Sequence, residues 1–122
     1  MKILVCDDAE VMRRIHINIL VEHGIKQDDI VQASDGAEAL KLMKNNQIRL
    51  FLIDWNMPNL NGFELVQKIR GMEQYQHTPI VMVTAEGGKY NVMEAIEAGV
   101  TNYVLKPIKA NLLWSKIQPY LD

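Results

Sequence analysis

The feature of this 122-residue sequence that most restricts its fold is a fivefold alternation of short apolar runs with segments of helical periodicity. Apolar runs of this length are typical of strands, and apolar residues three or four positions apart are typical of helices. The pattern predicts strands over residues 2–6, 30–33, 50–54, 80–83 and 102–105. It predicts helices from Val11 to a stop at Gly24 and over about residues 36–45, 62–71, 91–98 and 109–120.

The predicted strands are continuously apolar rather than alternating, as in the run Leu50-Phe51-Leu52-Ile53. Continuous apolar runs are typical of parallel strands that helices cover on both faces. We therefore expect an α/β fold, a (βα)5 doubly wound five-stranded parallel sheet. A closed barrel of this type needs eight such units, so the length excludes it. We expect one domain over residues 1–122, because that length is near the mode for single domains.

Composition narrows the possible partners and compartment. Thirteen basic and fifteen acidic residues give a formal net charge of -2, so we expect no nucleic-acid or membrane partner that binds through bulk positive charge. The single cysteine, Cys6, excludes an intrachain disulfide and a multi-cysteine zinc site, as expected in a reducing compartment. No apolar stretch approaches the ~20 residues of a membrane span. We expect a cytoplasmic protein.

Polar residues follow four of the predicted strands at the point where each strand ends. Asp7 and Asp8 follow the first strand, Asp54 closes the third, and Thr84 and Lys106 follow the fourth and fifth. Because the carboxyl ends of parallel strands meet at one edge of the sheet, these side chains should lie together. Three neighbouring carboxylates require either a strongly raised pKa or a cation, and Mg²⁺ is the simpler answer. Thr84 and Lys106 then fit as partners of a phosphoryl group.

Each of these residues also has an ordinary structural interpretation. Asp7 with Glu10 fits the N-terminal cap of a helix, Asp54 can begin a turn, Thr84 can cap, and Lys106 can be a solvated lysine. Their joint occurrence at neighbouring strand ends favours the phosphoryl site over coincidence.

Several other residues have no clear functional spacing. His16, His23 and His77 do not have metal-ligand spacing, so we expect them at the surface or at helix ends. Trp114 lies beside an apolar line and either packs or faces a partner. Pro119 should stop or kink the last helix.

Five segments carry a resemblance to a known family that covers the whole chain. The segments are Asp7-Asp8, Met12-Arg13-Arg14, Asp54-Trp55-Asn56-Met57-Pro58 with Gly62, Val83-Thr84-Ala85-Glu86, and Tyr103 followed by Lys106-Pro107. With these segments the chain resembles the receiver domain of two-component response regulators, and within that family it is most similar to the stand-alone chemotaxis regulators. The resemblance implies the strand order 2-1-3-4-5 and a single receiver domain without an output domain.

The same resemblance implies the roles of the site residues. Asp54 resembles the family's phosphoryl acceptor, which receives phosphate from a sensor histidine kinase. Mg²⁺ would be held by the carboxylates of Asp8 and Asp54 and the backbone carbonyl of Asn56, with Asp7 holding a metal-bound water. Lys106 would pair with the phosphoryl oxygens, and the peptide bond that follows it is expected to be cis.

Further roles implied by the resemblance concern timing and output. Asn56 and Glu86 would tune dephosphorylation, and Thr84 and Tyr103 would form the switch. The surface that changes with them would be the partner surface, made of Lys89, Val92, Tyr103, Leu105, Ile108 and Lys109.

We therefore expect a monomeric signalling protein that controls protein binding in chemotaxis through a flagellar motor switch protein, with a phosphatase as a further possible partner. It would promote only its own phosphorylation and dephosphorylation and would not act as an enzyme on other substrates. Within this class, a phosphate sink and a phosphorelay intermediate stay open as alternatives. An aspartyl-phosphate hydrolase is disfavoured, because Asn56 stands where such enzymes need a second acid. A flavin-binding module is disfavoured, because Asp7 and Asp8 would repel a phosphate in the loop after the first strand.

Overall fold

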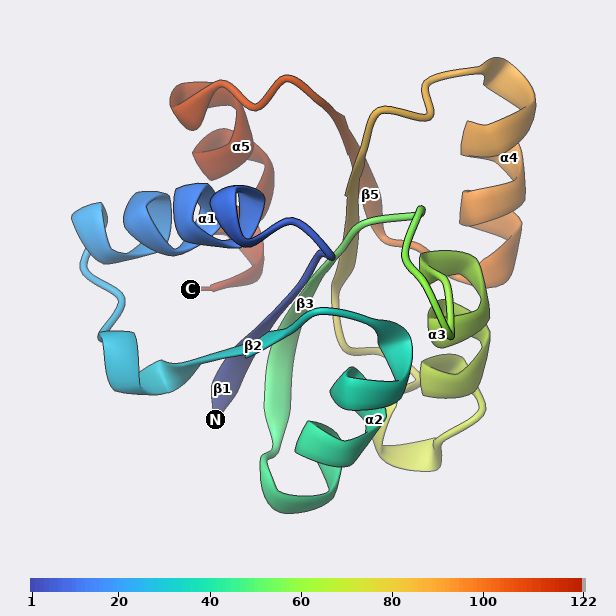
Figure 1. The fold of residues 1–122 in the computed structure, drawn as a ribbon, viewed down its shortest axis with the longest axis horizontal. Coiled ribbons are helices and arrows are strands. Elements are labelled where there is room, and N and C mark those ends of the chain that lie inside the picture. The colour runs from blue at the N-terminus through green and yellow to red at the C-terminus, as the bar shows by residue number, and fades with distance from the viewer. Residues whose placement is uncertain (122) are drawn as a thin grey trace.

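The structure, a computed structural model, describes residues 1–121, and it contains one five-stranded parallel sheet (Figure 1). The strand order is β2-β1-β3-β4-β5, which confirms the predicted fold and order. The strands are β1 (Lys2–Cys6), β2 (Ile30–Ala33), β3 (Ile48–Ile53), β4 (Ile80–Thr84) and β5 (Asn102–Leu105).

Five α-helices alternate with the strands, as the sequence predicts. They are α1 (Glu10–Glu22), α2 (Gly36–Asn45), α3 (Gly62–Arg70), α4 (Lys89–Ala98) and α5 (Ala110–Ile117). Short 3-10 turns follow α1, α3 and α5, namely η1 (Gln27–Asp29), η2 (Glu73–Tyr75) and η3 (Gln118–Tyr120). The predicted last helix ran on to residue 120, but α5 ends at Ile117 and continues as η3, because Pro119 lacks the N–H that an α-helix interior needs.

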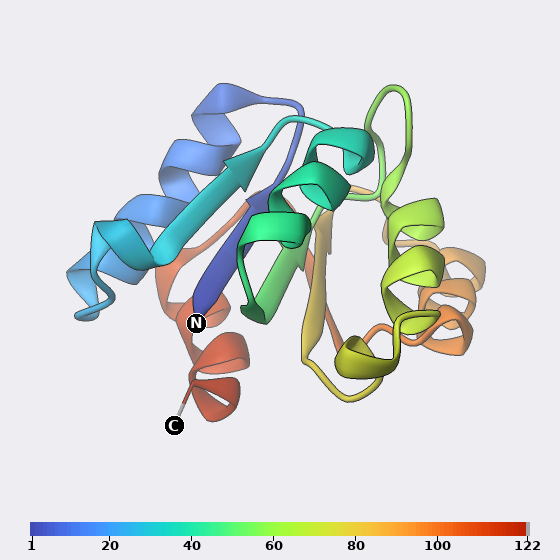
Figure 2. The ribbon, with the colours of Figure 1, turned by 90° about the horizontal axis from the view of Figure 1, so that it is seen from below.

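Helices cover both faces of the sheet and divide the core into two parts (Figures 1 and 2). Helices α1 and α5 lie on one face, and α2, α3 and α4 lie on the other. Alternate residues of one strand serve the two faces: Ile3 and Val5 belong to the first core, and Leu4 and Cys6 to the second. Because all four are fully buried, β1 is apolar on both faces, which is why its sequence shows no alternation.

Backbone hydrogen bonds continue the sheet one residue beyond the strand ends, and this positions the polar side chains. The amide of Asp7 donates to Ala33 O over 3.1 Å, and the amide of Asp54 donates to Cys6 O over 2.9 Å. The amide of Lys106 donates to Thr84 O over 2.9 Å. The residues after β1, β3 and β5 are therefore held at a single edge of the sheet.

Helix α4 is anchored more firmly at its C-terminus than at its N-terminus. The Arg70 guanidinium, at the end of α3, donates two hydrogen bonds of 2.8 and 2.9 Å to the carbonyl of Gly99, the residue that caps the C-terminus of α4. At the other end, Gly88 precedes α4 and offers no side-chain cap. The C-terminus of α4 is thus tied to α3, whereas its N-terminus follows two glycines.

On the α1 face of the sheet, one expectation from the sequence is wrong and one open question is answered. His16 was expected at the surface or at a helix end, and this is wrong: it is fully buried, because it shares one side of α1 with Ile19 and Leu20. Burial lowers the pKa of His16 to about 4, so the ring is neutral near pH 7. Trp114 packs within the protein, since its ring stacks on His23 with centroids 4.1 Å apart.

Within residues 1–121, no helix is long and apolar enough to cross a membrane.

The two glycines at the ends of α3 give a matched pair of substitutions. A Cβ at Gly62 would lie 2.1 Å from the Asp54 carbonyl oxygen, whereas a Cβ at Gly71 would meet nothing closer than 3.5 Å. Gly62→Ala should lower the free energy of unfolding by about 1–3 kcal/mol, as expected for overpacking. Gly71→Ala should leave it unchanged or raise it by about 0.4–1 kcal/mol. Urea unfolding measures both, and equal effects would contradict the close packing of Gly62 on Asp54.

Candidate functional site

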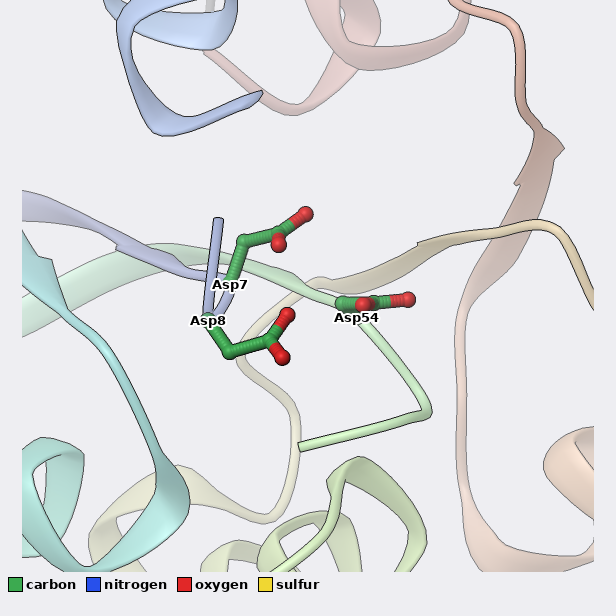
Figure 3. Close-up of side chains that lie close together, drawn as sticks. All are labelled: Asp7, Asp8 and Asp54. Atoms are coloured by element: carbon green, nitrogen blue, oxygen red, sulfur yellow. The ribbon is translucent and has the colours of Figure 1, made fainter. Parts of the chain in front are cut away.

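Three aspartates meet at the carboxyl edge of the sheet (Figure 3). One carboxylate oxygen from each of Asp7, Asp8 and Asp54 lies within 4.8 Å of the others. Asp7 is fully buried and Asp54 nearly so, whereas Asp8 is exposed. The sequence analysis placed these three residues together, and the structure brings them together. The cluster offers hard oxygen donors on one exposed side, which suits a divalent cation such as Mg²⁺.

Lys106 is the cation that the chain itself supplies to this cluster. Its Nζ lies 2.8 Å from Asp7 Oδ2 and 3.5 Å from Asp54 Oδ2. Burial acts to lower the pKa of Lys106, but the two carboxylates outweigh burial and raise it, so the ammonium stays charged. One lysine thus faces two buried acids, and the net charge of this group is negative. The peptide bond between Lys106 and Pro107 is cis, as expected.

Lys106 does not fully compensate the effects that raise the pKa of Asp54. Burial is the main cause that raises its pKa above the ordinary value, and the neighbouring Asp7 carboxylate raises it further. Lys106 and Thr84 act in the opposite direction without cancelling the shift. The ionised form of Asp54 is therefore destabilised in the fold, and a further positive charge at the cluster would stabilise it.

The helix-cap interpretation of Asp7 is wrong as a complete account of this residue. Ala9 is the N-terminal cap of α1, and no side chain caps that helix. Asp7 Oδ1 accepts a hydrogen bond from the Ala9 amide over 3.0 Å, while Asp7 Oδ2 pairs with Lys106. The carboxylate therefore holds both the turn into α1 and the lysine from the other end of the chain.

The loop between β3 and α3 forms the floor beside Asp8. Asn59, at its tip, has a positive φ of 66° and donates from Nδ2 to Asp35 Oδ2 over 2.7 Å, which ties the loop to the start of α2. A hollow of about 490 Å³ opens next to Asp8. It is lined by Asp8, Asn56, Met57, Pro58 and Asn61.

Glu86 links the two sides of the site mouth. Its Oε1 accepts a hydrogen bond of 2.8 Å from Asn56 Nδ2, and its Oε2 accepts one of 3.4 Å from Asn91 Nδ2 on α4. The structure thus joins Asn56 and Glu86, the two residues to which the resemblance gives a role in dephosphorylation. The contact with Asn91 was not foreseen, since only the fold brings that residue near.

The two expected switch residues, Thr84 and Tyr103, contact the same segment. Thr84 is fully buried, and its hydroxyl oxygen accepts a hydrogen bond of 3.3 Å from the Glu86 amide. The Tyr103 hydroxyl donates to the Glu86 carbonyl oxygen. Burial, followed by the charges of Glu86 and Asp54, raises the pKa of Tyr103 to about 12, so its hydroxyl remains a donor. Both side chains are positioned to respond if the backbone at Glu86 moves.

The expected partner surface is mixed in exposure. Lys89, Leu105 and Lys109 are exposed, whereas Val92, Tyr103 and Ile108 are half-buried. Sequence reasoning missed three exposed apolar side chains on α4, which are Tyr90, Met93 and Ile96. Their spacing of three residues was a usable signal, but it also fits a buried helix face.

Comparison with known proteins agrees with this geometry. A family model described as the response regulator receiver domain matches residues 3–118. The chain is 46% identical over 122 residues to a chemotaxis protein CheY homolog of Campylobacter jejuni, covering 99% of this chain and 92% of that protein. It is 43% identical to chemotaxis protein CheY1 of Helicobacter pylori, covering 99% of this chain and 97% of that protein.

The solved structure of Vibrio cholerae chemotaxis protein CheY4 has a similar fold. It superposes with a TM-score of 0.89 at 31% sequence identity, over 98% of this chain and 97% of that one. The family resemblance seen in the sequence is thus confirmed.

The raised pKa of Asp54 predicts a pH-dependent stability. A carboxyl group with a raised pKa binds its proton more tightly in the folded state, so its contribution to stability falls as pH rises above the unfolded value. In EDTA, Asp54→Asn should therefore raise the urea midpoint at pH 7, and this gain should shrink as pH falls toward 4. The exposed Asp28 is the control, and Asp28→Asn should change stability by less than about 0.5 kcal/mol. A lower midpoint for Asp54→Asn at pH 7, or a gain independent of pH, would contradict the prediction.

Proposed function

This chain belongs to the response regulator receiver domain family, and on that basis we propose that it is a CheY-like signalling protein controlled by phosphorylation of Asp54. The observation that carries the proposal is the pairing of Lys106 with Asp7 and Asp54 beside the exposed Asp8. A buried acceptor, a fixed ammonium and an open acidic face together suit a phosphoryl group that arrives with a divalent cation.

Mg²⁺ fits the donor set. Asp8 and Asp54 would hold it through carboxylate oxygens, Asn56 through its backbone carbonyl, and Asp7 through a water molecule. When bound, the ion supplies positive charge that offsets the oxygens of the transferring phosphoryl group. It also favours the ionised form of Asp54, which burial and Asp7 otherwise disfavour.

The reaction is a transfer from the phosphohistidine of a sensor histidine kinase. A carboxylate oxygen of Asp54 attacks phosphorus, a P–O bond forms, the P–N bond breaks, and the electron pair leaves with the imidazole. The Lys106 ammonium, already 3.5 Å from Asp54 Oδ2, pairs with a phosphoryl oxygen. Asn56 and Glu86, joined by a hydrogen bond at the site mouth, lie where they can govern the approach of water to the acyl phosphate.

The switch follows from charge and hydrogen bonding. A phosphoryl group adds about -1.5 to -2 charge and three acceptor oxygens. The Thr84 hydroxyl now accepts a hydrogen bond from the Glu86 amide. It would turn toward the phosphoryl oxygens and break that hydrogen bond. The carbonyl of Glu86, which Tyr103 holds, would shift with it, and Tyr103 would favour a buried rotamer. The change would reach the expected partner surface of Lys89, Val92, Tyr103, Leu105, Ile108 and Lys109.

The output we propose is control of protein binding in chemotaxis, with a flagellar motor switch protein as target and a phosphatase as a further partner. The support is that the relatives with 46% and 43% identity are named chemotaxis proteins. A phosphate sink or a phosphorelay intermediate would use the same aspartate chemistry, and target binding distinguishes them from motor control.

Acetyl phosphate tests the chemistry without the kinase. With Mg²⁺, the protein should gain one phosphoryl group by mass spectrometry, and EDTA should abolish the gain. Asp54→Asn should remove it, because an amide oxygen is a poor nucleophile, whereas the exposed control Asp28→Asn should label like wild type. Undiminished labelling of Asp54→Asn would exclude Asp54 as the acceptor.

Tyr103→Phe tests the switch separately from the chemistry. It removes the hydrogen bond to Glu86 and leaves the aspartates intact, so labelling by acetyl phosphate should persist. Beryllofluoride should strengthen wild-type binding to a motor-switch peptide, measured by calorimetry, and Tyr103→Phe should reduce this strengthening. Tyr120→Phe, which removes a hydroxyl outside the site, should behave like wild type. Equal wild-type affinity with and without beryllofluoride would count against motor control.

A further inference from the structure

A groove lies between α2 and α3 at the edge of the sheet opposite the aspartates. It consists of two adjoining hollows of about 590 and 250 Å³. Both hollows are lined by Met43, Lys44, Gln74 and Tyr75. Helices α2 and α3 cover the same face of the sheet and contact each other, and Figure 2 shows the η2 turn at the C-terminal end of α3. The groove is thus continuous and separate from the phosphorylation site.

The floor of the larger hollow is apolar. It is formed by Leu40, Met43, Met72 and Tyr75, of which Met43 and Tyr75 are 8% and 3% exposed. A volume of this size is within the range of about 300–1,000 Å³ typical of ligand pockets. One or two large apolar side chains fit such a space.

The rim of the same hollow is positively charged. Lys44 and Lys68 are exposed, lie in the last turns of α2 and α3, and form no ion pair with any part of the chain that the structure describes. No acidic residue lines either hollow. Lysines at helix C-termini also complement the helix dipole. Complementing a helix dipole does not require an apolar surface between the two lysines. The combination of two lysines with an apolar floor therefore points to a ligand that carries both negative charge and apolar groups.

The smaller hollow carries amides rather than apolar groups. Asn45, Gln47 and Gln74 line it with exposed side chains. Amide side chains both donate and accept hydrogen bonds, as a peptide backbone requires. An acyl chain could use the apolar floor and one lysine, but it would make no use of the second lysine or of these amides. A peptide matches all three regions of the groove.

Tyr75, in the floor of the groove, is held in place by contacts within the protein. Arg70 Nη1 donates hydrogen bonds of 2.7 Å to the carbonyls of Tyr75 and Thr78. The Tyr75 hydroxyl accepts a hydrogen bond of 3.3 Å from the Ile48 amide, and its ring packs edge-on against Phe51 with centroids 5.4 Å apart. A preformed floor reduces the ordering that binding requires.

We propose that this groove between α2 and α3 docks a short acidic peptide segment of a partner protein, with an apolar side chain in the larger hollow. Acidic side chains pair with Lys44 and Lys68, and the peptide backbone meets the amides of the smaller hollow. The interaction goes beyond the proposed phosphorylation function, because none of the groove residues belongs to that site.

Titration of the ¹⁵N-labelled full chain with an acetylated and amidated hexapeptide, EELFEE, tests the proposal by NMR. The expected shifts cluster at Gly71, at the side-chain amide of Gln74 and along the ends of α2 and α3. The charge-reversed peptide KKLFKK should produce none, and EEGSEE, which lacks the apolar side chains, should bind more weakly. Shifts elsewhere, or none up to about 2 mM EELFEE, would overturn the proposal.

Variants of the lysines separate recognition from folding. Lys44→Glu/Lys68→Glu should weaken EELFEE binding about tenfold, since two weak attractions become repulsions. Lys44→Gln/Lys68→Gln, which removes charge without repulsion, should weaken it less and should lower the urea midpoint only slightly, because each lysine stabilises a helix C-terminus weakly. The matched control Lys26→Glu/Lys116→Glu changes the same net charge outside the groove and should bind like wild type. Equal loss in the control, or shifts at the groove with sodium decanoate but not with EELFEE, would overturn the peptide assignment.

Discussion

The structure depends on a concentration of unlike charges that the parallel ladder forces together. Hydrogen bonds beyond the strand ends hold Asp7, Asp54 and Lys106 at one edge of the sheet. Burial of this edge strengthens the interactions between their charges. Burial, and then the neighbouring Asp7 carboxylate, raise the pKa of Asp54, and the single ammonium of Lys106 offsets this shift only in part. The carboxylates at this edge are therefore incompletely compensated by positive charge, and the proposed cation binding and phosphoryl transfer would act on that imbalance.

Glu86 connects this edge of the sheet with α4 and β5 through hydrogen bonds. Its side chain contacts Asn56 and α4, its amide is held by Thr84, and its carbonyl is held by Tyr103. Chemistry at the aspartates and the shape of the α4 and β5 surface thus share one residue. Since each contact is a single hydrogen bond, worth about 0.5–1.5 kcal/mol net, a modest change in charge can rearrange them.

Much of this architecture could be predicted from the sequence, because fully buried parallel strands produce unmistakable apolar runs. The strand-end rule then placed the aspartates, Thr84 and Lys106 without any coordinates. Strand order came only from the family resemblance, since local periodicity says nothing about which strands pair. His16 was misjudged because a histidine on a helix reads as polar, whereas its position beside Ile19 and Leu20 decides its burial. The start of β3 at Ile48, two residues early, reflects pairing with β1, and that contact is not local.

The unequal anchoring of α4 has a mechanical consequence. Arg70 clamps Gly99 at one end, whereas the other end follows Gly87 and Gly88. Because Asn91 Nδ2 donates to Glu86 Oε2, a displacement at Glu86 would be passed first to the N-terminal end of α4, near Lys89 and Tyr90. The hydrogen bonds from Arg70 would hold the opposite end, near Ala98, in place.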